Sequence, residues 1–396
     1  MPVPPGRVAL IAAVALAFTF AASFPALILP DSPTYLDPAR SWARGEGLME
    51  SPGQPLQYRL PAFPLLLGLV LRVFGESLRA VSIVHVLLHV GAMLLARAMV
   101  RRVDPATADW AAALAIVYPP FLTAAPTVLQ ETLLSFLAAL FAWCLWRAAE
   151  SEGLGRPLAA GLSLGAAALG KVVILPLAIP AALLVAFTPR RSLLRPAALL
   201  LGTAIVLVPW AARNKAVLGR FEITNNNGGH TFLGGAVTNN IEDWYGFPEY
   251  REAVDRWERG DRLKEPVLDR YLYGVGLERV KADPRRWLGL VAGRVVRFVL
   301  PARHWMGQTG WSTPGTITPL FVVAAGLHAL LFLAAAWLAV DVLRGRAPMT
   351  WLIAPVIVFW HLAVYAAVYV SPRYNVTVGP LLVAAATMWW ARRYKP

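Results

Sequence analysis

The chain has 396 residues and a mean hydropathy of +0.54, and 57% of its residues are hydrophobic. A soluble protein of this size needs far more polar surface, so the composition excludes the soluble globular classes. Several stretches exceed the roughly 18 apolar residues that mark a membrane helix, which predicts a polytopic membrane protein.

The formal net charge is +14, from 37 basic and 23 acidic residues. In a soluble protein this excess would suggest a nucleic-acid partner, but here the basic residues lie at the ends of apolar stretches rather than in one patch. That placement is typical of cytoplasmic loops that orient a membrane protein, so we expect no nucleic-acid partner. The single cysteine, Cys144, excludes an internal disulfide and a cysteine-based metal site.

Apolar runs and the positive-inside rule together predict an all-α fold of about ten transmembrane helices, with both termini in the cytoplasm. In chain order the expected spans are residues 8–30, 79–100, 107–124, 128–148, 157–171, 172–188, 193–212, 317–343, 350–370 and 374–391. The first is longer than the apolar core of a cleaved signal peptide, which has about 7–15 residues, so we expect it to be a membrane helix.

Two more apolar stretches, Arg59–Gly75 and Arg285–Arg303, fall short of a comfortable span. The second carries Arg294 and Arg297 in its middle, and each would cost about 2.5–3.5 kcal/mol if it faced lipid. If Arg59–Gly75 crossed the membrane, the short basic loops that follow would all move to the outer side. We therefore expect both stretches to be amphipathic helices at the interface, with a span as the alternative for Arg285–Arg303.

The outer side then holds two substantial segments, residues 31–78 and 213–316. Between Arg213 and Arg286 the second contains 12 of the 23 acidic residues, which is too much polarity for a simple connection. No internal repeat is visible, so an inverted-repeat transporter gains no support. We expect residues 1–396 to form one transmembrane domain with its functional site at the outer face.

Six ionisable residues lie at the outer ends of the predicted helices, although they are scattered along the sequence. They are Asp31, Arg59, Glu131, Lys171, Arg213 and Arg373. Several cations in one place suit a phosphate, and a carboxylate beside them suits a general base. Together they fit sugar transfer from a lipid-linked phosphosugar, in which the carboxylate takes the acceptor's proton and the cations stabilise the departing phosphate. A single displacement with one base inverts the anomeric carbon.

Local sequence offers simpler explanations for several of these residues. Asp31 and Ser32 precede a proline, which is the pattern of a helix N-cap with proline at the first helical position. Arg59 and Lys171 have the alternative of extending to the membrane interface. Glu131 has the weakest such explanation, because it begins an otherwise apolar stretch of membrane length.

The histidines give a weaker signal. His85 and His89 lie one helical turn apart, which is a metal-ligand spacing, but no acidic residue lies nearby, so we expect them to pack within the bundle. His230 lies in the segment "NNNGGHTFLGG". This composition suits either the presentation of backbone amides to a phosphate or sugar, or a plain cluster of turns.

Six segments, in order and spread over nearly the whole chain, resemble the GT-C superfamily of integral-membrane glycosyltransferases. The similarity is to the bacterial branch of glycosyltransferase family 39, the relatives of protein O-mannosyltransferases and aminoarabinose transferases. The segments are "DSPTYLDPARSWARGEG", "YRLPAFPLLLGLVLRVFG", "LQETLLSFLAAL", "GLSLGAAALGKVVIL", "PWAARNKAVLGRFEITNNNGGHTFLGG" and "SPRYNVTVGPLLVAA". The resemblance implies a GT-C bundle, a polyprenyl-phosphate-linked sugar as donor and an active site on the outer face.

Carried over residue by residue, the resemblance implies that Asp31 is the catalytic base. It implies that the donor phosphate contacts Arg59 and Arg373, with Lys171 and Arg213 as further cations. The residues expected to position donor or acceptor are Tyr35, Tyr58, Gln130, Glu131, Asn214, His230 and Tyr374. Many relatives have a second acidic residue where this chain has Ser32, which weakens the case for a metal.

We therefore expect an inverting glycosyltransferase of a bacterial inner membrane that transfers a sugar to a hydroxyl or amine on the extracytoplasmic side. Its partners are membrane lipid and the polyprenyl-phosphate sugar. No cofactor is required, while the acceptor (a lipid, a glycan or a protein) and the use of a divalent metal are left open. Tyr35 and the segment up to Gly47 are expected to form an interfacial helix beside the acceptor. The alternative, a transporter or permease for a lipid-linked phosphate, should show charges in mid-helix and repeat symmetry, and neither is visible.

Overall fold

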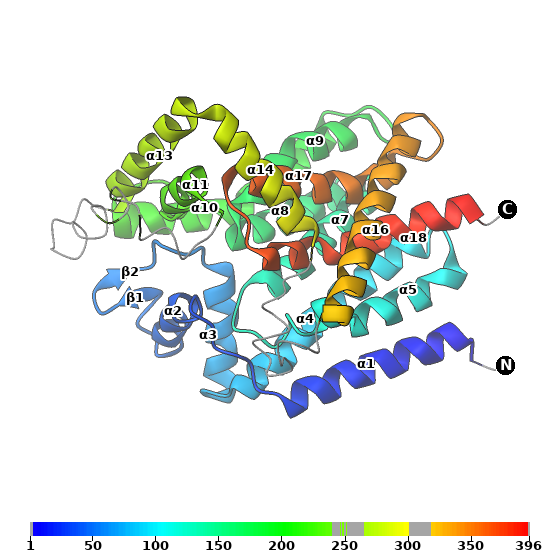
Figure 1. The fold of residues 1–396 in the computed structure, drawn as a ribbon, viewed down its shortest axis with the longest axis horizontal. Helices are drawn as coiled ribbons and strands as arrows, with labels where there is room; N and C mark the ends of the chain where they lie inside the picture. Colours follow the sequence, from blue (N-terminus) through cyan, green and yellow to red (C-terminus); the bar gives the residue numbers. More distant parts are fainter. Residues whose placement is uncertain are drawn as a thin grey trace.

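The structure, a computed structural model, describes residues 3–239, 265–300 and 318–394 and the single positions 246, 248 and 251. The bundle is formed by α1 (Pro5–Ser23), α4 (Leu78–Val100), α5 (Pro105–Val117), α7 (Glu131–Ala149), α8 (Gly155–Gly170), α9 (Ala178–Phe187), α10 (Leu194–Leu218), α16 (Thr318–Leu343), α17 (Ile353–Val368) and α18 (Gly379–Tyr394). Of these, α1, α5 and α18 run roughly along the longest axis of the molecule, whereas α16 crosses it steeply (Figure 1). The other elements are α2 (Pro33–Ala43), β1 (Met49–Ser51), β2 (Gln54–Pro55), α3 (Ala62–Phe74), α6 (Pro119–Leu122), η1 (Val172–Leu177), α11 (Gly228–Val237), α13 (Glu265–Ala282), α14 (Pro284–Val299), η3 (Met349–Leu352) and η4 (Pro372–Val378).

Several of the described helices have the length and composition of membrane spans. Six are long and apolar enough to cross a membrane: Pro5–Ser23, Leu78–Val100, Glu131–Ala149, Leu194–Leu218, Phe321–Leu343 and Met349–Val368. Three further apolar segments, Ala62–Phe74, Pro105–Val117 and Val172–Phe187, are shorter. Each of the ten predicted spans coincides with a helical segment, and the only strands among the described residues are the short pair β1 and β2. The prediction of an all-α polytopic membrane protein is therefore confirmed.

Two predicted spans extend too far, and a proline explains each error. The first helix ends at Ser23 rather than at residue 30, because Phe24 precedes a proline and adopts an extended conformation (φ −120°, ψ 119°). The third ends at Val117 rather than at residue 124, because Tyr118 precedes Pro119 and has a ψ of 117°. In both places the chain leaves the helix early. An irregular segment follows α1, whereas the short helix α6 and then a second irregular segment follow α5.

These two irregular segments pair with each other and bring two acidic residues together. The Leu27 N–H donates to the Pro126 carbonyl at 2.8 Å, and the Val128 N–H donates to the Leu27 carbonyl at 2.9 Å. Asp31 follows the first segment, and Glu131, the first residue of α7, follows the second. The pairing therefore delivers both carboxylates to the same region, where they contact one arginine.

The predicted interfacial helix up to Gly47 is shorter in the structure. α2 ends at Ala43, and Gly45 and Gly47 adopt φ angles of 86° and 84°, which reverse the chain after the helix. The antiparallel β1–β2 hairpin follows, which is not among the elements predicted from the sequence. The hairpin leads through Tyr58 and Arg59 into α3, the first of the two predicted interfacial helices.

The other predicted interfacial helix is α14, and its Arg294 does not face lipid. The Arg294 side chain is fully buried, and it donates through Nη1 to the Ala366 carbonyl at 3.0 Å and through Nη2 to the Gly235 carbonyl. These carbonyls belong to the last turns of α17 and α11, where backbone acceptors lack intrahelical partners and attract a cation. Residues 301–303 of the predicted stretch lie outside the described residues.

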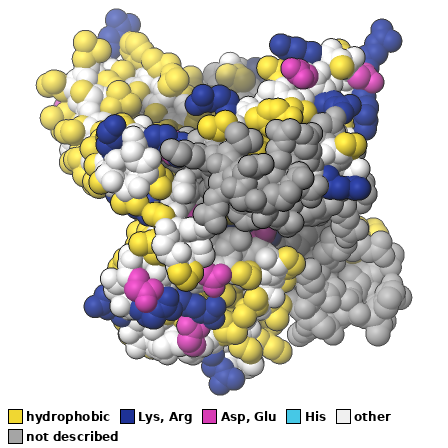
Figure 2. All heavy atoms as spheres, turned by 90° about the vertical axis from the view of Figure 1, so that its left-hand side faces the viewer, with side chains coloured by type: hydrophobic (Ala, Val, Ile, Leu, Met, Phe, Trp, Pro, Cys, Tyr) yellow, Lys and Arg dark blue, Asp and Glu magenta, His cyan; other side chains and the backbone are white. Residues whose placement is uncertain are grey.

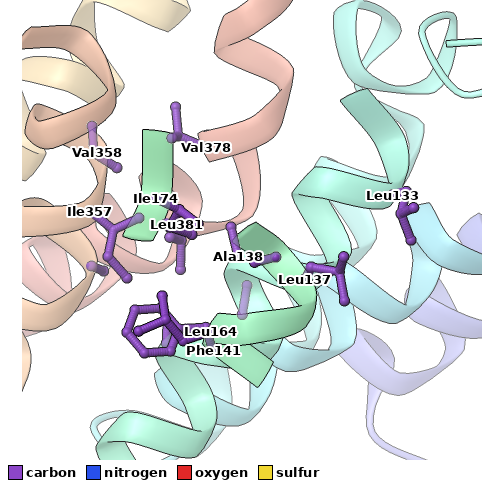
Figure 3. Close-up of a cluster of buried hydrophobic side chains, with 14 of the residues drawn as sticks. Leu133, Leu137, Ala138, Phe141, Leu164, Ile174, Ile357, Val358, Val378 and Leu381 are labelled. Atoms are coloured by element: carbon purple, nitrogen blue, oxygen red, sulfur yellow. The ribbon is translucent and has the colours of Figure 1, made fainter. Parts of the chain in front are cut away.

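Small residues allow α8 and α10 to touch along their backbones. A Cβ added at Gly161 of α8 would lie 1.9 Å from the Leu199 carbonyl oxygen, and one at Gly202 of α10 would lie 2.3 Å from that of Leu158. Close approach through small residues is typical of helix pairs in membranes. The neighbouring core is apolar, and side chains from α7, α8, η1, α17, η4 and α18 meet in the cluster shown in Figure 3.

Both termini lie at one end of the bundle, and α2, the hairpin, α11 and α13 lie at the opposite end (Figure 1). Seen from this second end, charged side chains gather on the lower part of the face (Figure 2). Around α2, Arg40 pairs with Glu76 at 2.9 Å and Arg44 pairs with Glu46 at 2.7 Å. Such exposed pairs add little stability, but they make this end polar.

Candidate active site

The Asp31 carboxylate lies between two arginines from distant parts of the chain. Its Oδ2 accepts a hydrogen bond from the Arg373 guanidinium, and its Oδ1 lies 3.4 Å from Nη2 of Arg59. The Asp31 side chain is 37% exposed, whereas those of Arg59 and Arg373 are 12% and 18% exposed. The carboxylate is thus held in place and is also reachable from outside the protein.

The geometry distinguishes between the two interpretations of the Asp31–Ser32 pair. No side chain caps the N-terminus of α2. The Ser32 hydroxyl instead accepts a hydrogen bond from the Leu29 N–H at 2.8 Å and donates one to the Val128 carbonyl at 2.9 Å. Because the Asp31 carboxylate contacts the arginines, the N-cap explanation does not account for it.

Arg373 also contacts a second carboxylate, that of Glu131. Nε of Arg373 lies 3.2 Å from Oε1 of Glu131, whose side chain is 4% exposed. Oε2 of Glu131 is buried and has no hydrogen-bond partner in the described part of the chain. A buried carboxylate needs a countercharge, and its position in the first turn of α7 is also favoured by the helix dipole. Glu131 therefore holds Arg373 from the side of the bundle, while Asp31 contacts it from the accessible side.

Arg59 is also fixed by a hydroxyl group and two aromatic rings. Its Nε donates to Oγ1 of Thr34 at 2.9 Å, and its guanidinium carbon lies 4.6 Å and 4.9 Å from the ring centroids of Tyr35 and Tyr58. Stacking on aromatic faces orients a guanidinium while its N–H groups still point outward in the plane. Tyr35 is itself buried in an edge contact with Phe63 of α3, so the whole arrangement rests on a packed core.

Lys171 joins α8 to η1 and completes the group of cations. Its Nζ lies 3.8 Å from the ring centroid of Tyr374 and 4.7 Å from that of Tyr365. Tyr374 follows Arg373 directly, and the centroids of the two tyrosine rings are 4.6 Å apart. Tyr365 was not predictable as a site residue, because an aromatic residue inside an apolar span gives no signal that separates a site residue from a core residue.

The two arginines change the acid–base properties of the carboxylate between them. Burial alone would raise the pKa of Asp31, but the positive charges of Arg373 and Arg59 outweigh burial and hold this pKa below its ordinary value. Burial opposes the charge of Arg373 as well, but Glu131, Tyr374 and Asp31 outweigh it and raise the Arg373 pKa. Near neutral pH the site therefore contains an ionised carboxylate beside charged guanidinium groups.

Two predicted residues lie apart from this cluster. Arg213 donates to the carbonyls of Leu56 at 2.9 Å and Leu48 at 3.2 Å, and the adjacent Asn214 donates to the Glu222 carbonyl at 2.8 Å. Both side chains thus fix loops at this end of the bundle. Their predicted contacts with a substrate stay predictions.

The remaining predicted residues have simpler surroundings. Gln130 is buried next to Glu131, and His230 lies on α11, where burial lowers its pKa. His85 and His89 contact the carbonyls of Ala125 at 2.9 Å and Ile116 at 3.0 Å, which confirms that they pack within the bundle. Over the described ranges, no group of three His, Cys, Asp or Glu side chains is arranged to hold a metal ion.

An apolar cavity of about 500 Å³ opens between α7, α9 and α17. Its lining includes Phe141, Leu145, Leu177, Phe187 and Ile357. Leu177 ends the short helix η1 that begins directly after Lys171, and Ile357 lies one turn of α17 from His361, which lines a smaller cavity beside Lys171. The large cavity is therefore built on the same elements that carry this end of the cation cluster.

One comparison with known proteins finds a family. Residues 54–212 match a family model described as dolichyl-phosphate-mannose-protein mannosyltransferase. The matched region runs from the β-hairpin to α10 and contains Arg59, Glu131 and Lys171, so the resemblance to these glycosyltransferases is confirmed over that stretch. No protein with a curated description matches the chain.

Among solved structures, two crystal structures of ArnT from Cupriavidus metallidurans are similar to this chain. The apo structure has a TM-score of 0.46 and 16% sequence identity, and the match covers 97% of this chain and 76% of that chain. The structure bound to undecaprenyl phosphate has a TM-score of 0.43 and 15% identity, and the match covers 97% of this chain and 77% of that chain.

Proposed function

We propose that the protein is an inverting glycosyltransferase that moves a sugar from a polyprenyl-phosphate-linked donor to an acceptor hydroxyl or amine. The observation that carries this proposal is the accessible Asp31 carboxylate held between Arg59 and Arg373. The family match adds support, because the name of the matched family includes a sugar carried on a polyprenyl phosphate.

In this mechanism Asp31 is the general base. Its lowered pKa keeps it ionised at neutral pH, and its partial exposure lets an acceptor approach it. The acceptor passes its proton to the carboxylate while its oxygen or nitrogen attacks the anomeric carbon of the donor. The new bond forms on the face opposite to the departing phosphate, so the anomeric configuration inverts.

Arg59, Arg373 and Lys171 bind the phosphate that leaves. Negative charge grows on the phosphate oxygen as its bond to the sugar breaks, and cations placed there beforehand stabilise that charge without protonating it. Guanidinium groups pair well with phosphate oxygens, and the lysine supplies a compact charge. Because the same arginines hold Asp31, the base and the phosphate-binding groups are positioned together.

The apolar cavity accounts for the hydrocarbon part of the donor. Its walls come from α7, α9 and α17, and its volume of about 500 Å³ lies within the range of ligand pockets. Lipid tails are as apolar as this lining, so the cavity would hold part of the chain by close packing rather than by removing apolar surface from water. Leu177, at one end of the lining, closes the short helix that begins directly after Lys171, so we propose that the phosphate lies on that side.

Several neighbouring residues position these groups or the substrates. The ring contacts described above support a role for Tyr35 and Tyr58 in orienting Arg59, and for Tyr374 in orienting Lys171. Glu131 fixes Arg373. For Gln130, Asn214 and His230 we keep the proposal that they help to position donor or acceptor.

We place this site on the extracytoplasmic side of a bacterial inner membrane, with both termini in the cytoplasm. The support comes from charge: the loop between α4 and α5 and the loop after α16 lie at the same end as the termini (Figure 1). These loops carry Arg101, Arg102, Arg344 and Arg346. Short loops rich in arginine remain on the cytoplasmic side.

Sugar transfer by full-length protein in nanodiscs tests the proposal. The protein is offered a panel of polyprenyl-phosphate sugars, and released polyprenyl phosphate is measured with and without candidate acceptors. Consumption of one donor establishes the activity and names the sugar. If no donor in the panel is bound or consumed, the proposal fails, and transport of a lipid-linked phosphate becomes the function to test.

A further inference from the structure

The backbone of Leu56, Gln57 and Tyr58, the three residues before Arg59, makes more hydrogen bonds to protein groups than is usual for a loop. The N–H of Leu56 donates to the Leu48 carbonyl at 2.9 Å, and the carbonyl of Leu56 accepts from Nη1 of Arg213 at 2.9 Å. The carbonyl of Gln57 accepts from the Asn226 N–H at 3.1 Å. Surface loops usually leave such groups to water, whereas here protein groups bind them.

Glu50 supplies the remaining bonds on the N–H side of this segment. Its Oε1 accepts from the Gln57 N–H at 2.7 Å and also from the Tyr58 N–H. The Tyr58 carbonyl accepts from Nδ2 of Asn225 at 2.9 Å. All six backbone groups of residues 56–58 thus have a protein partner, and one half-buried carboxylate on β1 provides two of them.

This arrangement determines where the Arg59 side chain begins. Arg59 follows Tyr58 directly, and its guanidinium stacks on the Tyr58 ring while it lies 3.4 Å from Asp31. A backbone displacement at Tyr58 would therefore move both the ring and the cation. A misplacement of about 1 Å can cost about 100-fold in rate, and the loss of one hydrogen bond between charged groups can cost about 10- to 100-fold in affinity.

We propose that Glu50 is a positioning residue that holds Arg59 in the donor-phosphate site. This inference rests on the proposed function, because it assigns Arg59 to the phosphate. In the described part of the chain the Glu50 carboxylate accepts hydrogen bonds from backbone N–H groups, and the charges of Arg213 and Arg59 also act on it. We therefore assign it an effect through Arg59 and not on the reacting atoms. Burial, the largest influence on the Glu50 carboxyl, raises its pKa, while the hydrogen bonds that it accepts from Gln57 and Tyr58 act in the opposite direction.

Binding of a short-chain polyprenyl phosphate to full-length protein in nanodiscs tests the proposal. Glu50→Ala removes the acceptor and is expected to weaken binding about 10- to 100-fold. Glu50→Gln keeps an oxygen acceptor and is expected to stay within about 3-fold of wild type. The matched control is Glu46→Ala, which removes an exposed carboxylate from the loop between α2 and β1. It is expected to leave binding unchanged. Equal binding by wild type and Glu50→Ala would overturn the inference.

A double variant separates positioning from a general structural effect. If Glu50 acts through Arg59, Glu50→Ala has no further effect on phosphate binding in an Arg59→Gln background, whose remaining affinity comes from Arg373 and Lys171. If Glu50 merely stabilises the protein, the two losses add. Additive losses would therefore overturn the proposal.

Hydrogen exchange of the ligand-free protein supplies a readout that needs no substrate. Glu50→Ala is expected to speed exchange at the N–H groups of Gln57 and Tyr58 while α4 keeps its protection. Should that variant fail to fold, Glu50→Asp, whose shorter side chain cannot span both N–H groups, replaces it with smaller changes in the same direction. Unchanged exchange at residues 57 and 58 would contradict the inference. Loss of binding in wild type itself would instead refute the proposed function, and this inference with it.

Discussion

Asp31 and Arg373 are separated by 342 positions in the sequence, and their side chains form an ion pair at the start of α2. Asp31 follows the first span, and Arg373 lies in η4 just before the last helix. The pair therefore joins the segment after the first helix of the bundle to the segment before its last helix. Glu131, from the start of α7, meets the same guanidinium at 3.2 Å, so three distant segments share one contact.

Replacement of Arg373 should destabilise the protein strongly. Arg373→Gln leaves the Glu131 carboxylate, which is 4% exposed, without its countercharge, and breaking a buried pair in this way costs about 3–5 kcal/mol. We expect a clear fall in the thermal unfolding temperature of the purified protein. Arg40→Gln breaks an exposed pair with Glu76 and should cost less than about 1 kcal/mol. The double variant Arg373→Gln, Glu131→Gln should recover much of the loss, and no recovery would contradict a role for buried charge.

The pH dependence of kcat/KM should report the cations around Asp31. The base works as the carboxylate, so activity is present above the Asp31 pKa and is lost as the pH falls through it. Because Arg373 and Arg59 hold that pKa below its ordinary value, the wild-type profile should keep its activity into the acid range. Arg59→Gln removes one of the lowering charges and should move the acid limb to higher pH, whereas Arg59→Lys keeps the charge and should move it less. A profile that is the same in all three proteins would argue against Asp31 as the titrating base.

Contact between α8 and α10 should not tolerate a methyl group at Gly161. The added Cβ would meet the Leu199 carbonyl oxygen at 1.9 Å, which is backbone and cannot move aside. We expect Gly161→Ala to destabilise the protein by about 1–3 kcal/mol, measured as a fall in the thermal unfolding temperature. Gly326→Ala on α16 is the control, because a Cβ there meets no atom of the described residues within 4 Å. Equal stability of the two variants would contradict the close approach of α8 and α10.

The side of the membrane on which the charged residues lie is easier to predict from the sequence than the groups that they contact. Hydropathy and the positive-inside rule place Arg373 and Arg213 on the same side of the membrane. In the structure Arg373 contacts two carboxylates, whereas Arg213 donates to backbone carbonyls of the segment before Arg59. The partner of a guanidinium depends on which distant segments meet, and the period of apolar residues carries no such information.

The errors in the predicted helix ends and in the predicted loop structure have different causes. The early ends of α1 and α5 follow from Phe24 and Tyr118, each of which precedes a proline, so this information was present in the sequence. The β1–β2 hairpin was not predictable in the same way, because strands of three and two residues are too short to show alternation. The role of Glu50 on β1 was not predictable either, because an acidic residue in a polar loop ordinarily faces solvent.

The most direct test of the account compares Asp31→Asn with Asp37→Asn in nanodiscs that contain the donor consumed by wild type. Asp31 is the proposed base, whereas Asp37 is an exposed acid six positions further along the chain, in α2. The measurement is release of polyprenyl phosphate, together with donor binding. We expect Asp31→Asn to bind the donor but to lose about 100- to 10,000-fold in kcat, while Asp37→Asn keeps wild-type activity. Near-normal turnover by Asp31→Asn would show that Asp31 is not the catalytic base.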